Sequence, residues 1–105
     1  MQIESDNIRG FKLNAGVEII AEVEEETPTS FKLKKALFWQ LTQVAETRYD
    51  ILFFPLSDGL QPDEDGSLPA IDAEIYKSSI LVSYKIRSEI KERYKQNVSP
   101  IMLLQ

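Results

Sequence analysis

The sequence contains neither cysteine nor histidine among its 105 residues. The absence of cysteine excludes disulfides, thiol nucleophiles and thiolate zinc sites. The absence of histidine removes the commonest general base and the commonest metal ligand. A glycine-rich phosphate loop and a Gly-x-Ser-x-Gly nucleophile motif are also absent. We therefore expect a protein that is not an enzyme and that needs no metal or other cofactor.

Long hydrophobic runs are missing as well, since no stretch approaches the roughly 20 apolar residues that span a bilayer. Residues 1–6 carry acids where a signal peptide would carry basic residues ahead of an apolar core. The rest of the composition is ordinary for a globular protein, with four glycines and five prolines. We therefore expect one soluble domain over residues 1–105, located in the cytoplasm and without a membrane partner.

The net charge of −5 argues against indiscriminate coating of nucleic acid, because such binding needs many lysine and arginine contacts to phosphate. The charge is unevenly distributed along the chain. Residues 57–75 hold six acids and no base, whereas residues 85–95 hold five bases and two acids. A local basic surface is therefore expected within an acidic protein.

Residues 16–44 are typical of a long antiparallel meander that begins with a glycine. Apolar and charged residues alternate in the runs 17–24 and 31–37, which is the period of half-buried strands. Both strands are therefore expected to share one apolar face and one solvated face. The apolar set consists of Val17, Ile19, Ala21, Val23, Phe31, Leu33 and Leu37.

The turn at residues 26–30 must keep both apolar sets on one face, which requires an odd number of loop residues. The allowed registers place Glu24 opposite Lys32 or Lys34. Each such cross-strand pair contributes roughly 0.2–1 kcal/mol. A solvated, salt-bridged face explains these charges without any binding site.

Further strands are expected at 37–44, 49–56, 71–76 and 80–84. The segment 49–56 is almost continuously apolar, which favours a strand covered on both faces. Pro55 should end its pairing or place it at the edge of the sheet.

Residues 57–70 combine turn residues with acids and are expected to form the one long loop of the domain. Within it, residues 63–66 resemble part of a calcium loop, but the acids lack the full spacing and no bidentate Glu follows. Residues 86–97 carry apolar side chains every four residues among charges, which predicts an amphipathic C-terminal helix. Its charged face could contact phosphate or an acidic partner, although such a face is usually only solvated.

Five or six consecutive strands with one helix can close into a small, strongly bent antiparallel barrel, which removes most exposed edges. The expected fold is therefore mostly β, with an added C-terminal helix. Residues 51–54 and 80–82 are more apolar than a domain of this size easily hides. A neighbouring copy could cover them, and the alternative cover is the C-terminal helix with residues 101–104.

Four segments together resemble a family of small Sm-like (LSm-like) proteins found in marine phages. They are Gly16–Glu26, Phe31–Leu37, Glu74–Tyr84 and Glu89–Tyr94. The resemblance implies a five-stranded Sm-like barrel and a homo-oligomeric ring closed by strand pairing between neighbours. It also implies nucleic-acid binding, usually of single-stranded RNA, in the cytoplasm of an infected bacterial host.

In cellular Sm proteins the nucleotide pocket combines an Asp-x-x-Met-Asn-type turn with an Arg-Gly turn. The corresponding positions here are about 34–39, which contain neither Asp nor Asn, and 77–79, which contain a lysine but no Arg-Gly pair. A nucleotide site in this chain must therefore use other residues.

A site for single-stranded nucleic acid combines cations for phosphate with aromatic faces for stacking, worth roughly 1–3 kcal/mol per base. Lys34, Lys35, Trp39 and Lys77 could supply both in each subunit. Trp39 also alternates in phase with apolar neighbours, so a core role stays open.

The leading hypothesis is therefore a non-enzymatic ring that binds RNA or single-stranded DNA as a processing accessory of phage origin. One alternative is a structural or protein-interaction ring that has lost nucleic-acid binding. Another is a monomeric barrel unrelated to Sm proteins.

Overall fold

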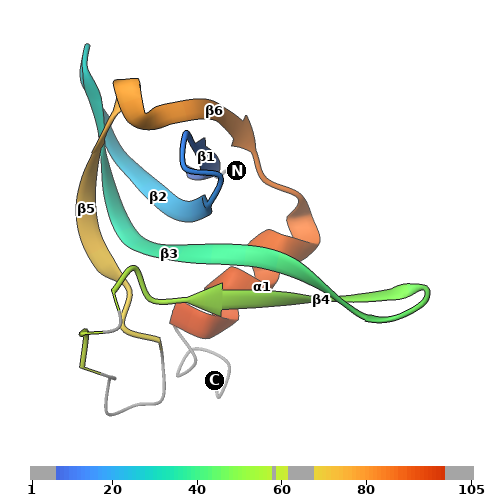
Figure 1. Ribbon diagram of the computed structural model, residues 1–105. Coiled ribbons are helices and arrows are strands. Elements are labelled where there is room, and N and C mark those ends of the chain that lie inside the picture. Colours follow the sequence, from blue (N-terminus) through green and yellow to red (C-terminus); the bar gives the residue numbers. More distant parts are fainter. Residues whose placement is uncertain (1–6, 58, 62–67, 99–105) are drawn as a thin grey trace, which may run out of the picture.

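The computed structural model describes residues 7–57, 59–61 and 68–98, which form six β-strands, a 3-10 turn and a C-terminal α-helix (Figure 1). The mostly-β fold with a C-terminal helix is therefore confirmed. In chain order the elements are β1 (Ile8–Leu13), β2 (Glu18–Glu26), β3 (Ser30–Ala45), β4 (Arg48–Phe54), β5 (Ile71–Tyr76), η1 (Lys77–Ser79), β6 (Ile80–Lys85) and α1 (Ser88–Val98).

All six strands belong to one antiparallel sheet with the order β4-β3-β2-β1-β6, and β5 also pairs with β3. β5 pairs with the first half of β3 and β4 with the second half, so both use the edge of β3 that faces away from β2. β5 and β6 thus lie at opposite ends of the path β5-β3-β2-β1-β6, and η1 joins them directly in the chain. Among the described residues no ladder joins β5 to β6. The sheet is therefore open and six-stranded, and the closed five-stranded barrel implied by the resemblance is not confirmed.

β3 is one long bent strand where the sequence pattern predicts two. Its pairing with β5 shifts register between Leu33 and Ala36, and within this bulge Lys35 has φ of 56°. Leu33 consequently packs into one core cluster and Leu37 into the other. The expectation that Phe31, Leu33 and Leu37 share a face is wrong for Leu37, because the extra residue inverts the side-chain alternation.

The register between β2 and β3 also differs from the expected one. Lys32 lies opposite Glu25 and Lys34 lies opposite Glu22, so Glu24 faces neither lysine directly. The register shift between Val23 and Glu25 causes the difference, because it leaves Glu24 unpaired in the ladder. The turn has four residues between the paired Glu26 and Phe31, so the expectation of an odd number is wrong. The bulge between Val23 and Glu25 restores the phase of the side chains beyond the turn.

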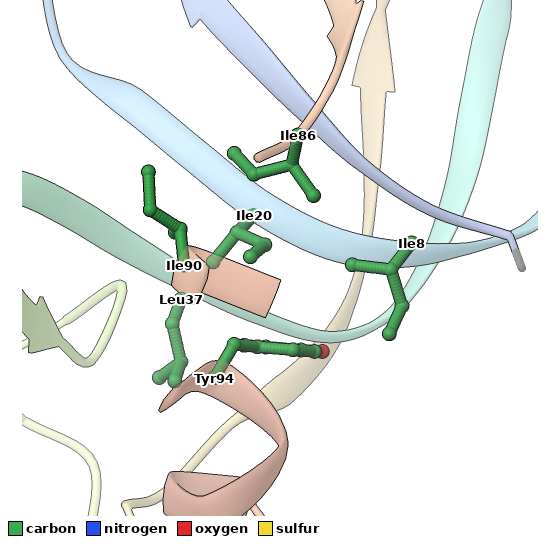
Figure 2. Close-up of a cluster of buried hydrophobic side chains, with 6 residues drawn as sticks. All are labelled: Ile8, Ile20, Leu37, Ile86, Ile90 and Tyr94. Carbon is green, nitrogen blue, oxygen red and sulfur yellow. The ribbon is translucent and has the colours of Figure 1, made fainter. Parts of the chain in front are cut away.

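The core consists of two apolar clusters on opposite faces of the sheet, since successive strand residues point to opposite faces. β2 contributes to both, because Ile20 lies in the first cluster and its neighbours Ile19 and Ala21 lie in the second. The expected solvated face is therefore lost at the centre of β2. The first cluster packs the sheet against α1 (Figure 2) and contains Ile8, Ile20, Leu37, Ile86, Ile90 and Tyr94.

β1 is the strand that the sequence pattern does not predict. Ile8 belongs to the first cluster and Phe11 to the second, so its apolar residues do not alternate with polar ones. A strand buried on both faces has no period-2 signal. Its assignment depends on its pairing with β2 and β6, which no local pattern reveals.

The expected strands at 71–76 and 80–84 are confirmed as β5 and β6, and the expected helix at 86–97 is confirmed as α1. β4 ends directly before Pro55 and lies at the edge of the sheet, as predicted. The prediction that this strand is covered on both faces is wrong within one chain. Leu52 and Phe54 are 37% and 41% exposed, because no described element covers that side of the outermost strand.

Residues 63–66, with the partial calcium motif, and residues 101–104 lie outside the described residues. In the described part, no group of three or more acidic, histidine or cysteine side chains could hold a metal ion. Within the same residues, no helix is long and apolar enough to cross a membrane.

Candidate functional site

The four residues predicted to bind nucleic acid lie in two separate regions of the molecule. Lys77 lies in η1, where its backbone N–H donates to the carbonyl of Thr29 in the β2–β3 turn. Lys34 and Lys35 lie at the bulge of β3, whereas Trp39 lies farther along the strand, opposite Glu18. The structure thus brings Lys77 close to the start of β3 but leaves Trp39 toward the opposite end of the β2–β3 ladder.

Two of the three predicted lysines face glutamates. Lys77 Nζ lies 2.7 Å from Glu26 Oε2, and Lys34 Nζ lies 4.0 Å from Glu24 Oε2. Lys77 Nζ also lies 5.2 Å from the ring centre of Phe31, a cation–π distance. These exposed pairs contribute little stability, but they balance the positive charge of this face. The arrangement is the salt-bridged surface that the alternation of glutamates and lysines suggests.

Lys35 connects three elements through its backbone. Its N–H donates to Asp72 Oδ1 of β5 at 3.3 Å, and its carbonyl accepts a 2.6 Å hydrogen bond from the Tyr94 hydroxyl of α1. The side chain of Lys35 is exposed. The most direct role of this residue is therefore to fix the bulge of β3 against β5 and α1.

Trp39 belongs to a polar chain across the sheet. Its Nε1–H donates to the Tyr84 hydroxyl at 3.2 Å, and that hydroxyl donates to the carboxylate of Glu18. Burial raises the pKa of Tyr84, and the hydrogen bond to Glu18 raises this pKa further. The Tyr84 hydroxyl therefore stays protonated at neutral pH and holds the Glu18 carboxylate beside the indole ring.

Beside this chain the surface contains a hollow of about 460 Å³ between the β1–β2 turn and the middle of β3. The hollow lies at the start of β2, where β3 extends beyond its ladder with β2. Trp39 is half-buried and packs on the first core cluster, while part of its ring also lines the hollow. Besides Gly16 and Val17 of the turn, the hollow is lined by Glu18, Phe38, Trp39, Gln40, Leu41 and Phe54.

The chemistry of this hollow is aromatic and acidic. Its walls include three aromatic rings, and Glu18 is the one ionisable group among the described residues that line it. Sequence analysis does not find Glu18 or Tyr84, because their contact joins residues 66 positions apart. The aromatic character of Trp39 is the one signal that the sequence offers for this location.

A second feature is the apolar surface of the two outermost strands, β4 and β6. Leu81 and Val82 of β6 are 65% and 46% exposed, and Leu52 and Phe54 of β4 are also exposed. In the described part of the chain, each of these strands pairs on one edge only. The other edge presents unpaired backbone groups next to apolar side chains, which is typical of a strand-pairing interface.

A third feature is a pair of cations at the β1–β6 ladder. Arg9 and Lys85 lie directly opposite each other, and Arg9 Nη2 donates to Ser83 Oγ at 3.2 Å. Like charges in this position destabilise a sheet. Neither side chain forms an ion pair with another described residue, so both remain able to bind an anion.

No protein-family model matches this chain, and no curated protein sequence is significantly similar to it.

Proposed function

We propose that this chain is the subunit of a non-enzymatic, Sm-like homo-oligomeric ring that works by holding other proteins. The observation that carries the proposal is the presence of two outer strands, β4 and β6, each with an unpaired edge and exposed apolar side chains. Pairing β4 of one copy with β6 of the next would satisfy both edges and cover both apolar surfaces. Repeating this heterologous contact closes a ring if the rotation between neighbours allows closure.

The topology supports the Sm-like part of the proposal. The sheet is strongly bent, and its two ends, β5 and β6, are consecutive in the chain and joined by a single 3-10 turn (Figure 1). This arrangement brings the end of β5 next to the start of β6, as a small Sm-like barrel would require. Together with the sequence resemblance, it supports our proposal that the protein is a small phage Sm-like protein that acts in the cytoplasm of the infected cell.

Charge favours the interaction role over nucleic-acid binding. Glutamates face Lys34 and Lys77, and the whole chain carries a net charge of −5. A phosphate backbone approaching the β2–β3 turn would meet the carboxylates along with the lysines. A protein surface can instead use the exposed apolar side chains of this subunit.

Light scattering on the sized protein tests the ring. We expect a discrete oligomer, which a Leu81→Glu variant converts to monomers because a charge at the β6 edge blocks pairing. Val44→Glu is the matched control, since Val44 is also exposed but lies outside β4 and β6. A monomeric wild-type protein would reject the ring and leave an isolated β-domain.

Nucleic-acid binding remains the second candidate, and the opposed Arg9 and Lys85 are the observation that favours it. Two neighbouring cations could hold one phosphate. Fluorescence anisotropy of labelled single-stranded RNA and DNA at two salt concentrations tests this role. Binding lost in Arg9→Ala/Lys85→Ala would locate the site on β1 and β6, and binding lost in Lys35→Ala/Lys77→Ala would locate it at the bulge and η1. The absence of binding at low salt would reject this role.

A further inference from the structure

The second half of β3 has a strand partner on one edge only. Residues 40–45 pair with β4, whereas the ladder with β2 stops at Trp39, opposite Glu18. In Figure 1, β3 and β4 run on together beyond β2 as a projecting two-stranded arm. Among the described residues no strand occupies the edge of 40–45 that β2 leaves open. This edge therefore presents backbone N–H and C=O groups to an incoming strand.

The open edge begins at the aromatic hollow. Trp39, Phe38 and Phe54 provide ring surface there, and Glu18 provides a carboxylate. An ammonium or guanidinium group placed between an indole face and a carboxylate gains both a cation–π contact and a charge-assisted hydrogen bond. The hollow thus matches a basic side chain and repels a phosphate.

Among the described residues, no cation forms an ion pair with Glu18. Lys12 lies directly opposite Glu18 in the β1–β2 ladder, yet no ion pair joins these two described residues. The carboxylate instead accepts the hydrogen bond of Tyr84, which is uncharged. A cation from outside the subunit can therefore still pair with Glu18.

We propose that an extended basic segment of a partner protein adds as a strand beside residues 40–45 and places a lysine or arginine side chain in the hollow. The segment would form main-chain hydrogen bonds with β3, while its basic side chain would lie against Trp39 and Glu18. Leu41, which is 47% exposed, gives an apolar contact for an alternate side chain of the segment. This assignment rests on the protein-interaction role proposed above and names the chemistry of the partner.

The probe is the peptide acetyl-Thr-Val-Arg-Val-Thr-amide, and the reporter is Trp39, the one tryptophan of the sequence. We expect a saturable change in tryptophan fluorescence. Replacing the arginine by citrulline removes the charge and should weaken binding by about tenfold. N-methylation of both valines blocks main-chain pairing and should weaken binding at least as much.

Matched variants locate the site. Glu18→Gln keeps an acceptor for Tyr84 but removes the charge, so it should weaken arginine-peptide binding by about tenfold. Glu24→Gln, the same change elsewhere on β2, should leave binding unchanged. Equal binding of the citrulline peptide, an unaffected Glu18→Gln variant, or no fluorescence response at millimolar peptide would each overturn the proposal.

Light scattering keeps this test separate from that of the ring. Loss of the oligomer in a folded Leu41→Lys variant would assign the open edge of β3 to a second copy and overturn the peptide proposal. An intact oligomer that does not bind the peptide would overturn the peptide proposal alone. Peptide binding by a monomeric protein would support the peptide site while rejecting the ring.

Discussion

The ring of Tyr84 lies directly over Gly10. A Cβ atom at residue 10 would be 2.2 Å from Tyr84 Cε1 and 2.4 Å from Cζ, and the two residues are opposite each other in β6 and β1. Because glycine leaves this space free, the Tyr84 hydroxyl reaches Glu18 on β2 and Trp39 on β3. The absence of a side chain at residue 10 thus lets Tyr84 of β6 lie over β1 and contact β2 and β3. Two of the residues that it contacts, Glu18 and Trp39, line the hollow.

Gly10→Ala should therefore destabilise the fold by about 1–3 kcal/mol, the usual cost of overpacking. The added methyl group displaces the Tyr84 ring, which also breaks its hydrogen bond with Trp39. Urea unfolding measures the first effect, and a shift in tryptophan emission reports the second.

A double-mutant cycle provides the control for this prediction. In a Tyr84→Ala background the methyl group at residue 10 has room, so Gly10→Ala should cost almost nothing there. An equal cost in both backgrounds would mean that the backbone of β1, rather than the Tyr84 ring, requires glycine.

The buried tyrosine of α1 predicts a loss of stability in alkali. Burial raises the pKa of Tyr94 above its ordinary value of 10.0, and the nearby charge of Glu22 raises it further. The folded state therefore keeps this proton at a pH where the unfolded state releases it. The contribution of Tyr94 to the free energy of unfolding is complete below pH 10.0. It falls as the pH rises above this value, by about 1.4 kcal/mol per pH unit.

Tyr94→Phe should remove this part of the pH dependence, as measured by urea unfolding between pH 9 and 11. At neutral pH the same variant should lose about 1–2 kcal/mol, because the carbonyl of Lys35 loses its 2.6 Å hydrogen bond. Tyr76→Phe is the control, since Tyr76 is 58% exposed. An unchanged alkaline slope in Tyr94→Phe would contradict the prediction.

The left-handed backbone of Lys35 predicts that glycine is better than lysine at this position. A φ of 56° costs a residue with a side chain about 1 kcal/mol, and glycine avoids that cost. Lys35→Gly should therefore stabilise the protein by up to about 1 kcal/mol in urea unfolding. Lys34→Gly, one position earlier in the same strand, should instead destabilise it, because glycine weakens ordinary strand positions.

This bulge also shows where the sequence stops determining the fold. The alternation of apolar and charged residues predicts β2, β5 and β6, and the four-residue spacing predicts α1 with Ile90 and Tyr94 inward. The phase of β3 is not predictable, because Lys35 has no turn-forming character and its unusual φ depends on Asp72 and Tyr94. β1 is missed because it is buried on both faces.

The candidate site depends on the same long-range features. Trp39 is predicted from the sequence only as part of a nucleic-acid site with Lys34, Lys35 and Lys77, and none of these lysines lines the hollow. Glu18 cannot be predicted, since its position opposite Trp39 depends on the register of the whole β2–β3 ladder, which shifts twice. Tyr84 reaches both of them only because residue 10 is glycine. Register and close approach are set by tertiary pairing, which local alternation does not encode.

The ion pairs beside the β2–β3 turn lead to a last prediction. Glu24 forms an ion pair with Lys34, and Glu26 forms one with Lys77, so these carboxylates balance the lysines. A Glu24→Gln/Glu26→Gln variant should therefore bind labelled single-stranded RNA about fivefold more tightly than the wild-type protein at low salt. The gain should disappear at high salt, because it comes from exposed charges. Stability should change by less than about 1 kcal/mol per pair.

Anisotropy titrations at two salt concentrations measure this effect. The control is Glu46→Gln/Asp50→Asn, which removes two exposed negative charges from the projecting arm of β3 and β4. If the control variant gains as much affinity as Glu24→Gln/Glu26→Gln, the gain reflects net charge alone and the lysines at the turn have no special role. A gain confined to the turn variant would mean that these glutamates keep a phosphate backbone away from Lys34 and Lys77, which is how an acidic ring that holds proteins would avoid nucleic acid.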